Sequence, residues 1–167
     1  MIDNNCIIQT GLNNPILRTI SLPVKEIDKE VKKFCNDLKK NMRENDGVGL
    51  AAPQIGKNLR IISTTQREEK KKENKLIGEI IMINPEIIEK SKEMIVFEEA
   101  CLSLPNIIGK VKRNKIITVQ YLDLKGNLQK KKLKNLNSTI AQHEIDHLDG
   151  ILFMDKAMKE PKKKEKN

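Results

Sequence analysis

The chain contains 167 residues, of which 38% are hydrophobic and 33% charged, a composition that suits one globular domain with a hydrophobic core. The formal net charge of +9 favours polyanionic neighbours such as RNA, but a lysine-rich solubilising surface is the simpler interpretation. Aromatic residues make up only 2%, which argues against binding nucleic acid by stacking on its bases.

The sequence contains no apolar run long enough to span a membrane, and it starts without the basic-then-apolar pattern of a secretion signal. Its three cysteines, Cys6, Cys35 and Cys101, are unevenly spaced and do not suggest a disulfide framework. These features predict a cytoplasmic protein. We expect one domain over residues 1–158, followed by a basic, disordered tail over residues 159–167.

The first strongly periodic segment predicts an amphipathic helix over residues 24–46. Its apolar residues recur at helical spacing, with lysines and acids between them: Ile27, Val31, Phe34, Cys35, Leu38 and Met42. A small, glycine-rich stretch from Gly47 to Gly56 follows, and another chain can come close to its backbone. Pro53 argues against a helix in this stretch.

Short apolar runs separated by turn signals then predict a series of strands. They cover residues 59–63, 76–83, 94–97, 109–113, 115–122 and 128–133. The almost entirely charged stretch 66–75 is expected to be an exposed hairpin loop, and Asn84-Pro85 to turn the chain. Residues 123–127 are expected to form a hairpin turn, and the lysines that follow suit an edge strand.

The last helix is expected to begin near Asn137 or Ser138, either of which can cap it, and to end near Gly150. It carries both histidines of the chain, His143 and His147, four residues apart. Residues at this spacing share one helix face, so two imidazoles can bind one metal ion. Glu144 directly follows the first histidine and can exchange protons with a metal-bound water.

A catalytic metal ion normally has three protein ligands and one open position. The chain has no third histidine, so the third donor must be Cys, Asp or Glu. Cys101 is the best candidate, because it lies outside any clear helix and would bind the ion as a thiolate. Spacing alone does not distinguish it from Cys6 and Cys35, which we interpret as packing or exposed thiols.

Three stretches together resemble the motifs of the peptide deformylase family, in the family's order. Gly-x-Gly-x-Ala-Ala-x-Gln is matched by residues 47–54, and Gln-His-Glu-x-Asp-His-Leu by residues 142–148. Glu-Gly-Cys-Leu-Ser is matched by residues 99–103, except that Ala100 replaces the glycine. The resemblance covers nearly the whole chain.

The resemblance implies an α+β fold, with mixed, mostly antiparallel strands around a central metal-binding helix. It implies one divalent metal ion on Cys101, His143 and His147, with Fe(II) typical and Zn, Ni or Co as substitutes. It implies removal of the formyl group from formyl-methionyl nascent polypeptides. We expect the enzyme to be a cytoplasmic monomer. Ribosomal RNA is a further partner that the basic surface favours.

The remaining site residues follow from the same resemblance. Glu144 takes a proton from the attacking water and passes it to the leaving amine, while the side chain of Gln54 and the backbone N–H of Leu102 stabilise the oxyanion. The backbone positions that bind the peptide are Val48, Gly49 and Ala100. We expect the methyl group of Ala100 to alter the fit of the substrate without abolishing activity.

Glu99 and Asp146 are candidates for orienting ligands or basic side chains, although ordinary salt bridges explain them equally well.

Two other functions compete with deformylation. One is a different metallohydrolase, such as a small zinc peptidase using the same helix. The other is an inactive deformylase-like protein that binds metal structurally or docks on RNA.

Overall fold

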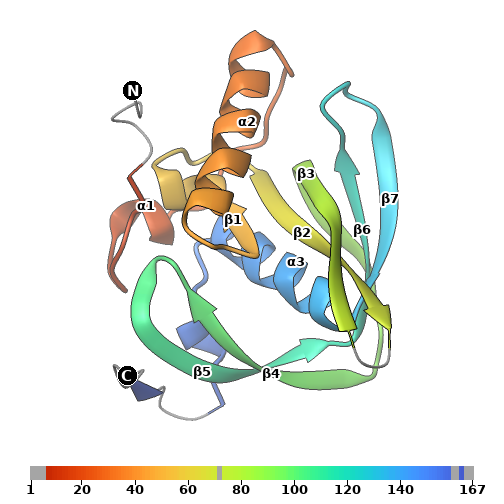
Figure 1. Ribbon diagram of the computed structural model, residues 1–167. Helices are drawn as coiled ribbons and strands as arrows, with labels where there is room; N and C mark the ends of the chain where they lie inside the picture. Colours follow the sequence, from red (N-terminus) through yellow and green to blue (C-terminus); the bar gives the residue numbers. More distant parts are fainter. Residues whose placement is uncertain (1–6, 71–72, 159–161, 164–167) are drawn as a thin grey trace.

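The computed structural model describes residues 7–70, 73–158 and 162–163, which form two antiparallel sheets and three α-helices (Figure 1). The larger sheet has the order β1-β2-β3-β6-β7, with strands Gly49–Ala51, Ile61–Lys70, Glu73–Lys90, Ile116–Leu122 and Leu128–Lys134. The smaller sheet has the order β4-β5-β8, with strands Met94–Cys101, Leu104–Asn114 and Lys162–Lys163. The predicted fold class, mixed and mostly antiparallel, is confirmed.

Helix α3 (Asn135–Leu148) lies at the centre of the molecule, between the larger sheet and the β4–β5 hairpin (Figure 1). Its residues from Ser138 to Leu148 are all buried, and three of its apolar side chains pack against the larger sheet, namely Ala141, Ile145 and Leu148. A helix buried on all sides must find partners for its polar side chains within the protein. The two histidines therefore lie in the interior, where their polar atoms need partners within the protein.

Helix α2 (Lys29–Glu44) packs on the outside through Cys35, Leu38 and Met42, which belong to a second apolar cluster. It begins at Lys29, five residues later than predicted, because the side chain of Asp28 accepts a hydrogen bond from the N–H of Val31 and caps the helix there. Helix α3, in contrast, begins before its expected caps. The side chain of Asn137 does not cap it but bonds the backbone of Arg67.

Two expectations for the strands are wrong. The expected loop over residues 66–75 is instead the continuation of β2 and β3, paired at Glu68 with Lys75. Opposite charges facing each other across two strands offset the lack of apolar residues. Asn84-Pro85 does not turn the chain: β3 continues through it with an irregular register against β6, and the left-handed φ of 51° at Asn84 accommodates the bulge.

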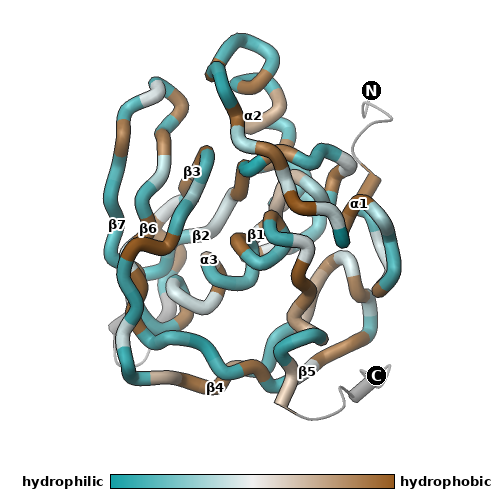
Figure 2. Tube along the Cα trace, turned by 180° about the vertical axis from the view of Figure 1, so that it is seen from behind, coloured by the Kyte–Doolittle hydropathy of each residue, from teal (hydrophilic) through white to brown (hydrophobic). Residues whose placement is uncertain are grey.

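Two other expectations, the turn over residues 123–127 and the edge strand after it, agree with the structure. The turn over residues 123–127 closes the β6–β7 hairpin, with the N–H of Asp123 donating to the carbonyl of Asn127. Strand β7 is one edge of the larger sheet, and Figure 2 shows it as mostly hydrophilic. The tail expected over residues 159–167 falls mainly outside the described residues, and Lys162–Lys163 within it form β8. Among the helices described, none has the length and apolar composition needed to cross a membrane.

The glycine-rich stretch forms β1 and a short 3₁₀ helix, η1 (Ala52–Ile55), so the expectation that Pro53 excludes a helix is wrong. Proline is compatible with the first turn of a helix, where its missing N–H has no partner to lose. Strand β1 is one edge of the larger sheet, and β4 is one edge of the smaller sheet. Both edge strands contribute residues to the same cavity.

Candidate metal centre and substrate cleft

Helix α3 brings the two histidine rings to a centroid distance of 5.0 Å, and both residues are buried. Cys101, at the end of β4, places its Sγ 3.2 Å from Nε2 of His147. One ligand atom from each of Cys101, His143 and His147 can be chosen so that all three lie within 4.8 Å of one another. Cys35, in contrast, lies on α2 and is buried in the core, and Cys6 lies outside the described residues.

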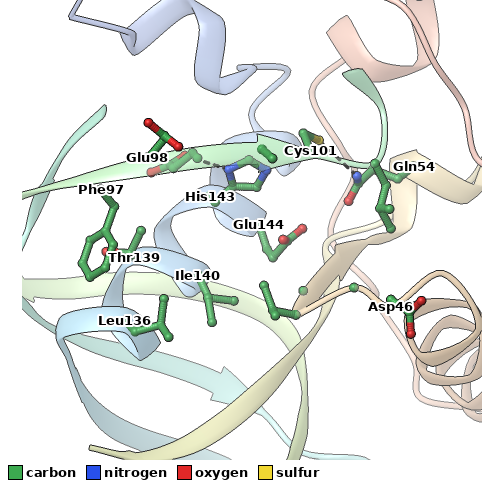
Figure 3. A pocket seen from close by; sticks show the side chains of 16 residues that line it. Asp46, Gln54, Phe97, Glu98, Cys101, Leu136, Thr139, Ile140, His143 and Glu144 are labelled. Atoms are coloured by element: carbon green, nitrogen blue, oxygen red, sulfur yellow. Dashed lines mark hydrogen bonds and ion pairs between the residues drawn. The ribbon is translucent and has the colours of Figure 1, made fainter. Parts of the chain in front are cut away.

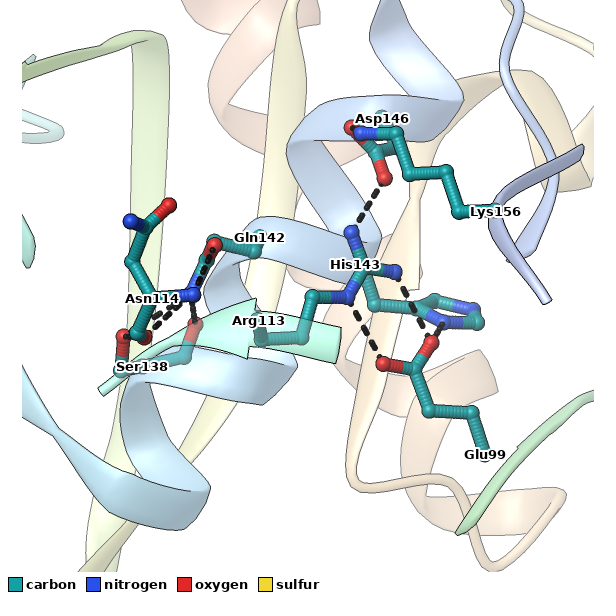
Figure 4. Close-up of polar contacts among 8 residues, drawn as sticks. All are labelled: Glu99, Arg113, Asn114, Ser138, Gln142, His143, Asp146 and Lys156. Carbon is teal, nitrogen blue, oxygen red and sulfur yellow. Dashed lines mark hydrogen bonds and ion pairs between the residues drawn. The ribbon is translucent and has the colours of Figure 1, made fainter. Parts of the chain in front are cut away.

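The ring of His143 is oriented by Glu99, whose Oε2 lies 2.8 Å from Nδ1 (Figure 4). An Nδ1–H that donates to this carboxylate leaves Nε2 free to bind a metal ion. Burial disfavours the charged form of Glu99, but hydrogen bonds from Arg113 and His143 outweigh it and hold its pKa at about 2. Glu99 is therefore a carboxylate at neutral pH.

Arg113, on β5, links Glu99 to Asp146 (Figure 4). Its guanidinium donates to both oxygens of Glu99, at 2.7 and 2.9 Å, and to Oδ2 of Asp146 at 2.5 Å. Lys156, in the 3₁₀ helix η2 (Phe153–Lys156), donates to the other oxygen of Asp146 at 2.6 Å. Glu99 and Asp146, which sequence reasoning left between two interpretations, thus both belong to one network behind the histidines.

Sequence reasoning missed Arg113 and Lys156. A signal for the first was present, because Val111 and Arg113 occupy alternate positions of β5 that face inward, whereas Lys110 and Lys112 are exposed. A charged residue at an inward position requires a buried partner of opposite charge. Lys156 follows an apolar run and carries no comparable signal.

Glu144 is 4% exposed, and among the residues that the structure describes its Oε2 has no hydrogen-bond partner. Burial is the main cause that raises the pKa of this carboxyl to about 7. Gly49 gives Glu144 its space: a Cβ at that position would lie 2.3 Å from Oε1. A buried carboxyl that changes its protonation state near neutral pH is suited to accepting and returning a proton.

The amide of Gln54 is held in one orientation. Its Oε1 accepts a hydrogen bond from the N–H of Ala51 at 2.8 Å, and its Nε2 donates to Oγ of Ser103 at 3.1 Å. The same Nε2 lies 3.5 Å from Sγ of Cys101. An N–H donor is therefore directed toward the Cys-His-His group before any substrate arrives, and Ser103 is a positioning contact that sequence reasoning did not assign.

A cavity of about 410 Å³ opens beside these groups (Figure 3). Its walls include Gln54, Cys101, Leu102, His143 and Glu144, together with the predicted peptide-binding positions Val48, Gly49 and Ala100. Figure 3 shows a further group of lining side chains, on α3 and β4, beyond the histidine: Phe97, Leu136, Thr139 and Ile140. Sequence reasoning missed this mainly apolar end, because nothing in the order of these residues indicates that a cavity separates them.

The donor set fits a divalent metal ion, since one thiol and two imidazoles converge and His143 is held in the tautomer that leaves Nε2 free. A buried carboxyl and a fixed amide N–H adjoin them in a cavity edged by two strands. These features together define a metal-dependent hydrolase.

The comparisons with known proteins are specific. The family model for polypeptide deformylase matches residues 8–164. A curated peptide deformylase from Rhizobium meliloti is 40% identical over 86% of this chain and 80% of its own length, and one from Dictyoglomus thermophilum is 41% identical over 92% and 94%. The chain therefore belongs to the polypeptide deformylase family, and it is a hydrolase that removes the N-terminal formyl group from nascent polypeptides.

Solved structures agree. The crystal structure of peptide deformylase from Thermotoga maritima has a TM-score of 0.85 and 34% identity, covering 94% of this chain and 100% of that one. A Met-Ala-Ser-bound class I type b peptide deformylase from Acinetobacter baumannii has a TM-score of 0.81 and 32% identity, covering 89% and 96%. The family resemblance seen in the sequence is confirmed.

Proposed function

We propose that Cys101, His143 and His147 hold one divalent metal ion, and that this ion is Fe(II). The support is the convergence of the three donors and the hydrogen bond that orients His143. A thiolate with two imidazoles also suits zinc, nickel and cobalt, so the choice of Fe(II) rests on the family. Metal analysis of protein purified without oxygen tests it, and zinc as the bound metal would contradict it.

When bound by these residues, the metal ion would supply Lewis acidity for the attack of water on the formyl carbon. Glu144 accepts the proton from that water at its unpartnered Oε2 and returns it to the leaving amine. The observation that carries this proposal is Oε2 of Glu144 beside the Cys-His-His group, an oxygen to which no described residue forms a hydrogen bond. A base without a competing hydrogen bond needs no rearrangement before the proton moves.

The oxyanion that develops on the formyl group receives hydrogen bonds from Nε2 of Gln54 and the backbone N–H of Leu102. Gln54 is already oriented by Ala51 and Ser103, so it serves as a preorganised donor. Leu102 lies in the tight turn between β4 and β5 and lines the cavity beside Cys101. Both donors are thus fixed by the backbone geometry around the metal ligand.

The peptide binds as an extra strand between the edges of β1 and β4, at Val48, Gly49 and Ala100. The carbonyl of Val48 already accepts hydrogen bonds from the N–H and Oγ1 of Thr65, at 2.8 and 3.0 Å, so a peptide at this edge uses the N–H of Val48. Ala100 is exposed on β4 opposite Ile108. Its methyl group therefore displaces no buried side chain, which supports retained activity.

The first residue of the substrate is methionine, whose side chain enters the apolar end of the cavity. Phe97, Leu136 and Ile140 line that end, and a flexible thioether adapts well to such a wall. The unbranched shape of methionine suits a narrow space between a strand and a helix. A preference for formyl-methionine over formyl-valine at the first position would support this assignment, and equal rates would contradict it.

The assay that tests the proposed function compares formyl-Met-Ala-Ser with Met-Ala-Ser and with acetyl-Met-Ala-Ser, using anaerobically iron-loaded protein. Formate release from the first peptide alone supports deformylation. Cleavage of a peptide bond in the unformylated peptide would favour another metallohydrolase, and metal binding without turnover would favour an inactive homologue.

We further propose that the enzyme is a cytoplasmic monomer that meets its substrates at the ribosome through its basic surface. Lys130, Lys132 and Lys134 are exposed on one face of the edge strand β7, and the chain has a net charge of +9. Contacts between lysines and phosphates weaken steeply with salt. Ribosome binding that does not change between low and high salt would contradict this proposal.

A further inference from the structure

Lys156 lies outside all three family motifs, yet it is the outer end of a chain of ionic contacts that reaches a metal-ligand candidate (Figure 4). Its Nζ lies 2.6 Å from Oδ1 of Asp146, and its side chain is 41% exposed. The lysine comes from η2, after the chain has left α3 and passed Gly150. The contact therefore links the segment that follows the helix to the back of the metal site.

Every side-chain nitrogen and oxygen of Asp146, Arg113 and Glu99 has a partner within the chain of contacts. One carboxylate oxygen of Asp146 accepts a hydrogen bond from Lys156, and the other accepts one from Arg113. One guanidinium nitrogen of Arg113 donates a hydrogen bond to Asp146, and the other two donate to Glu99. Oε2 of Glu99 accepts from Arg113 at 2.9 Å and lies 2.8 Å from Nδ1 of His143. A displacement of Asp146 is thus transmitted to the carboxylate that orients His143.

Within the group formed by Glu99, Arg113, Asp146 and Lys156, the charges balance when Lys156 is included. Glu99 and Asp146 are acids, Arg113 and Lys156 are bases, and the side chains of Glu99 and Arg113 are 5% and 2% exposed. Without Lys156, one guanidinium would face two buried carboxylates. Removing one partner from a buried ionic group leaves an uncompensated charge, which the remaining groups relieve by moving.

We propose that Lys156 is a positioning residue for the metal centre: by neutralising Asp146 it keeps Arg113 on Glu99, and Glu99 keeps the ring of His143 in the metal-binding orientation. This inference rests on the proposed role of Cys101, His143 and His147 as ligands. The competing explanation is that Lys156 only fastens η2 to α3.

The sign of the effect on metal affinity separates positioning from simple electrostatics. Removing a positive charge near a cation site, by itself, strengthens the binding of the cation. Loss of ligand orientation weakens it, and partners of metal ligands typically change affinity by about 10- to 100-fold when they are mutated. Because Lys156 acts on His143 through three intermediates, Asp146, Arg113 and Glu99, we expect a loss near the lower limit, about tenfold.

The test measures Zn²⁺ affinity of the metal-free full-length protein by competition with a chromogenic chelator, for Lys156→Met and Lys156→Arg. The matched control is Lys115→Met, because Lys115 also forms an ion pair at 2.7 Å, with Glu93, and is similarly exposed at 35%. We expect weaker binding only in Lys156→Met, with recovery in Lys156→Arg. The visible spectrum of the Co²⁺ form, which reports the coordination of the ion, should change in the same variant alone.

If Lys156→Met folds poorly, the Zn²⁺ affinity of Asp146→Asn provides a second test of the same chain of contacts. Because Lys156 acts through Asp146, the double variant should lose no more affinity than Asp146→Asn alone. Unchanged or tighter Zn²⁺ binding in Lys156→Met, with an unchanged Co²⁺ spectrum, would overturn the inference. If Cys101→Ser leaves Zn²⁺ affinity unchanged, the ligand assignment itself fails, and this outcome is distinct from a failure of Lys156.

Discussion

Replacing Gly49 by alanine would place a methyl carbon 2.3 Å from Oε1 of Glu144, and 2.8 Å from both Cγ and Cδ of that side chain. Ordinary carbon–oxygen contacts are longer by about 1 Å, so one of the two groups must move. Glu144 is 4% exposed and cannot swing into solvent. The substitution therefore displaces the proposed base without removing it.

A displacement of about 1 Å for a catalytic group costs roughly 100-fold in rate, and we expect kcat/KM on formyl-Met-Ala-Ser to fall by about that factor. The overpacking itself should lower the free energy of unfolding by about 1–3 kcal/mol. Bound metal should remain, because the contact is with Glu144 and not with Cys101, His143 or His147.

The measurement pairs steady-state kinetics with metal content and thermal unfolding. Gly47→Ala is the matched control, since a Cβ there would lie no closer than 3.2 Å to its nearest neighbours, which are Met42, Gly49 and Leu102. It should lose much less activity than Gly49→Ala. Wild-type kcat/KM in Gly49→Ala would refute the placement of Glu144 as the proton carrier in this position.

Four further outcomes are expected. Glu144→Gln should retain bound metal and lose at least about 100-fold in kcat, measured by formate release, and full activity would exclude its role as base. The pKa of Glu99 is about 2, below its unfolded value of 4.5, so its ionised form adds about 3 kcal/mol to stability above pH 4.5, and this is lost as pH falls toward 2. In metal-free protein, denaturant titrations should show the stability difference between wild type and Glu99→Gln shrinking as the pH falls from 6 to about 3, and a constant difference would contradict this. Ala100→Gly should change kcat/KM on formyl-Met peptides by less than about tenfold, and a larger gain would show that the methyl group hinders the substrate. Chelation should abolish formate release and lower Tm, both restored by Fe²⁺, and unchanged Tm would argue against a metal bound by folded protein.

The parts of the site that the sequence predicted are those in which chemistry imposes a spacing. Two histidines four residues apart must share a helix face, and Cys101 lies beside them at the end of β4, as the motifs implied. The buried ionic chain behind them was not predictable in this way. Arg113 lies one residue before the end of β5, and its partners Glu99 and Asp146 lie on β4 and α3. Only its inward position on β5 therefore indicated a role.

The fold expectations failed where tertiary contacts outweigh local preference. The charged stretch over residues 66–75 has little intrinsic reason to form strands, but pairing of β2 with β3 imposes it. Helix α3 begins at Asn135 without a side-chain cap, because the N–H of Asn135 bonds the carbonyl of Lys115 and fixes the chain there. Such long-range constraints leave no local signature.

The open edges of β1 and β4 belong to different sheets, and the cavity lies between them. In the binding mode proposed above, a peptide that occupies both edges would be recognised chiefly through its backbone amides, which are the same in every protein. Only its first side chain needs a dedicated space. This arrangement would let one enzyme process the whole variety of newly made chains, because each residue after the first would be bound through its backbone alone.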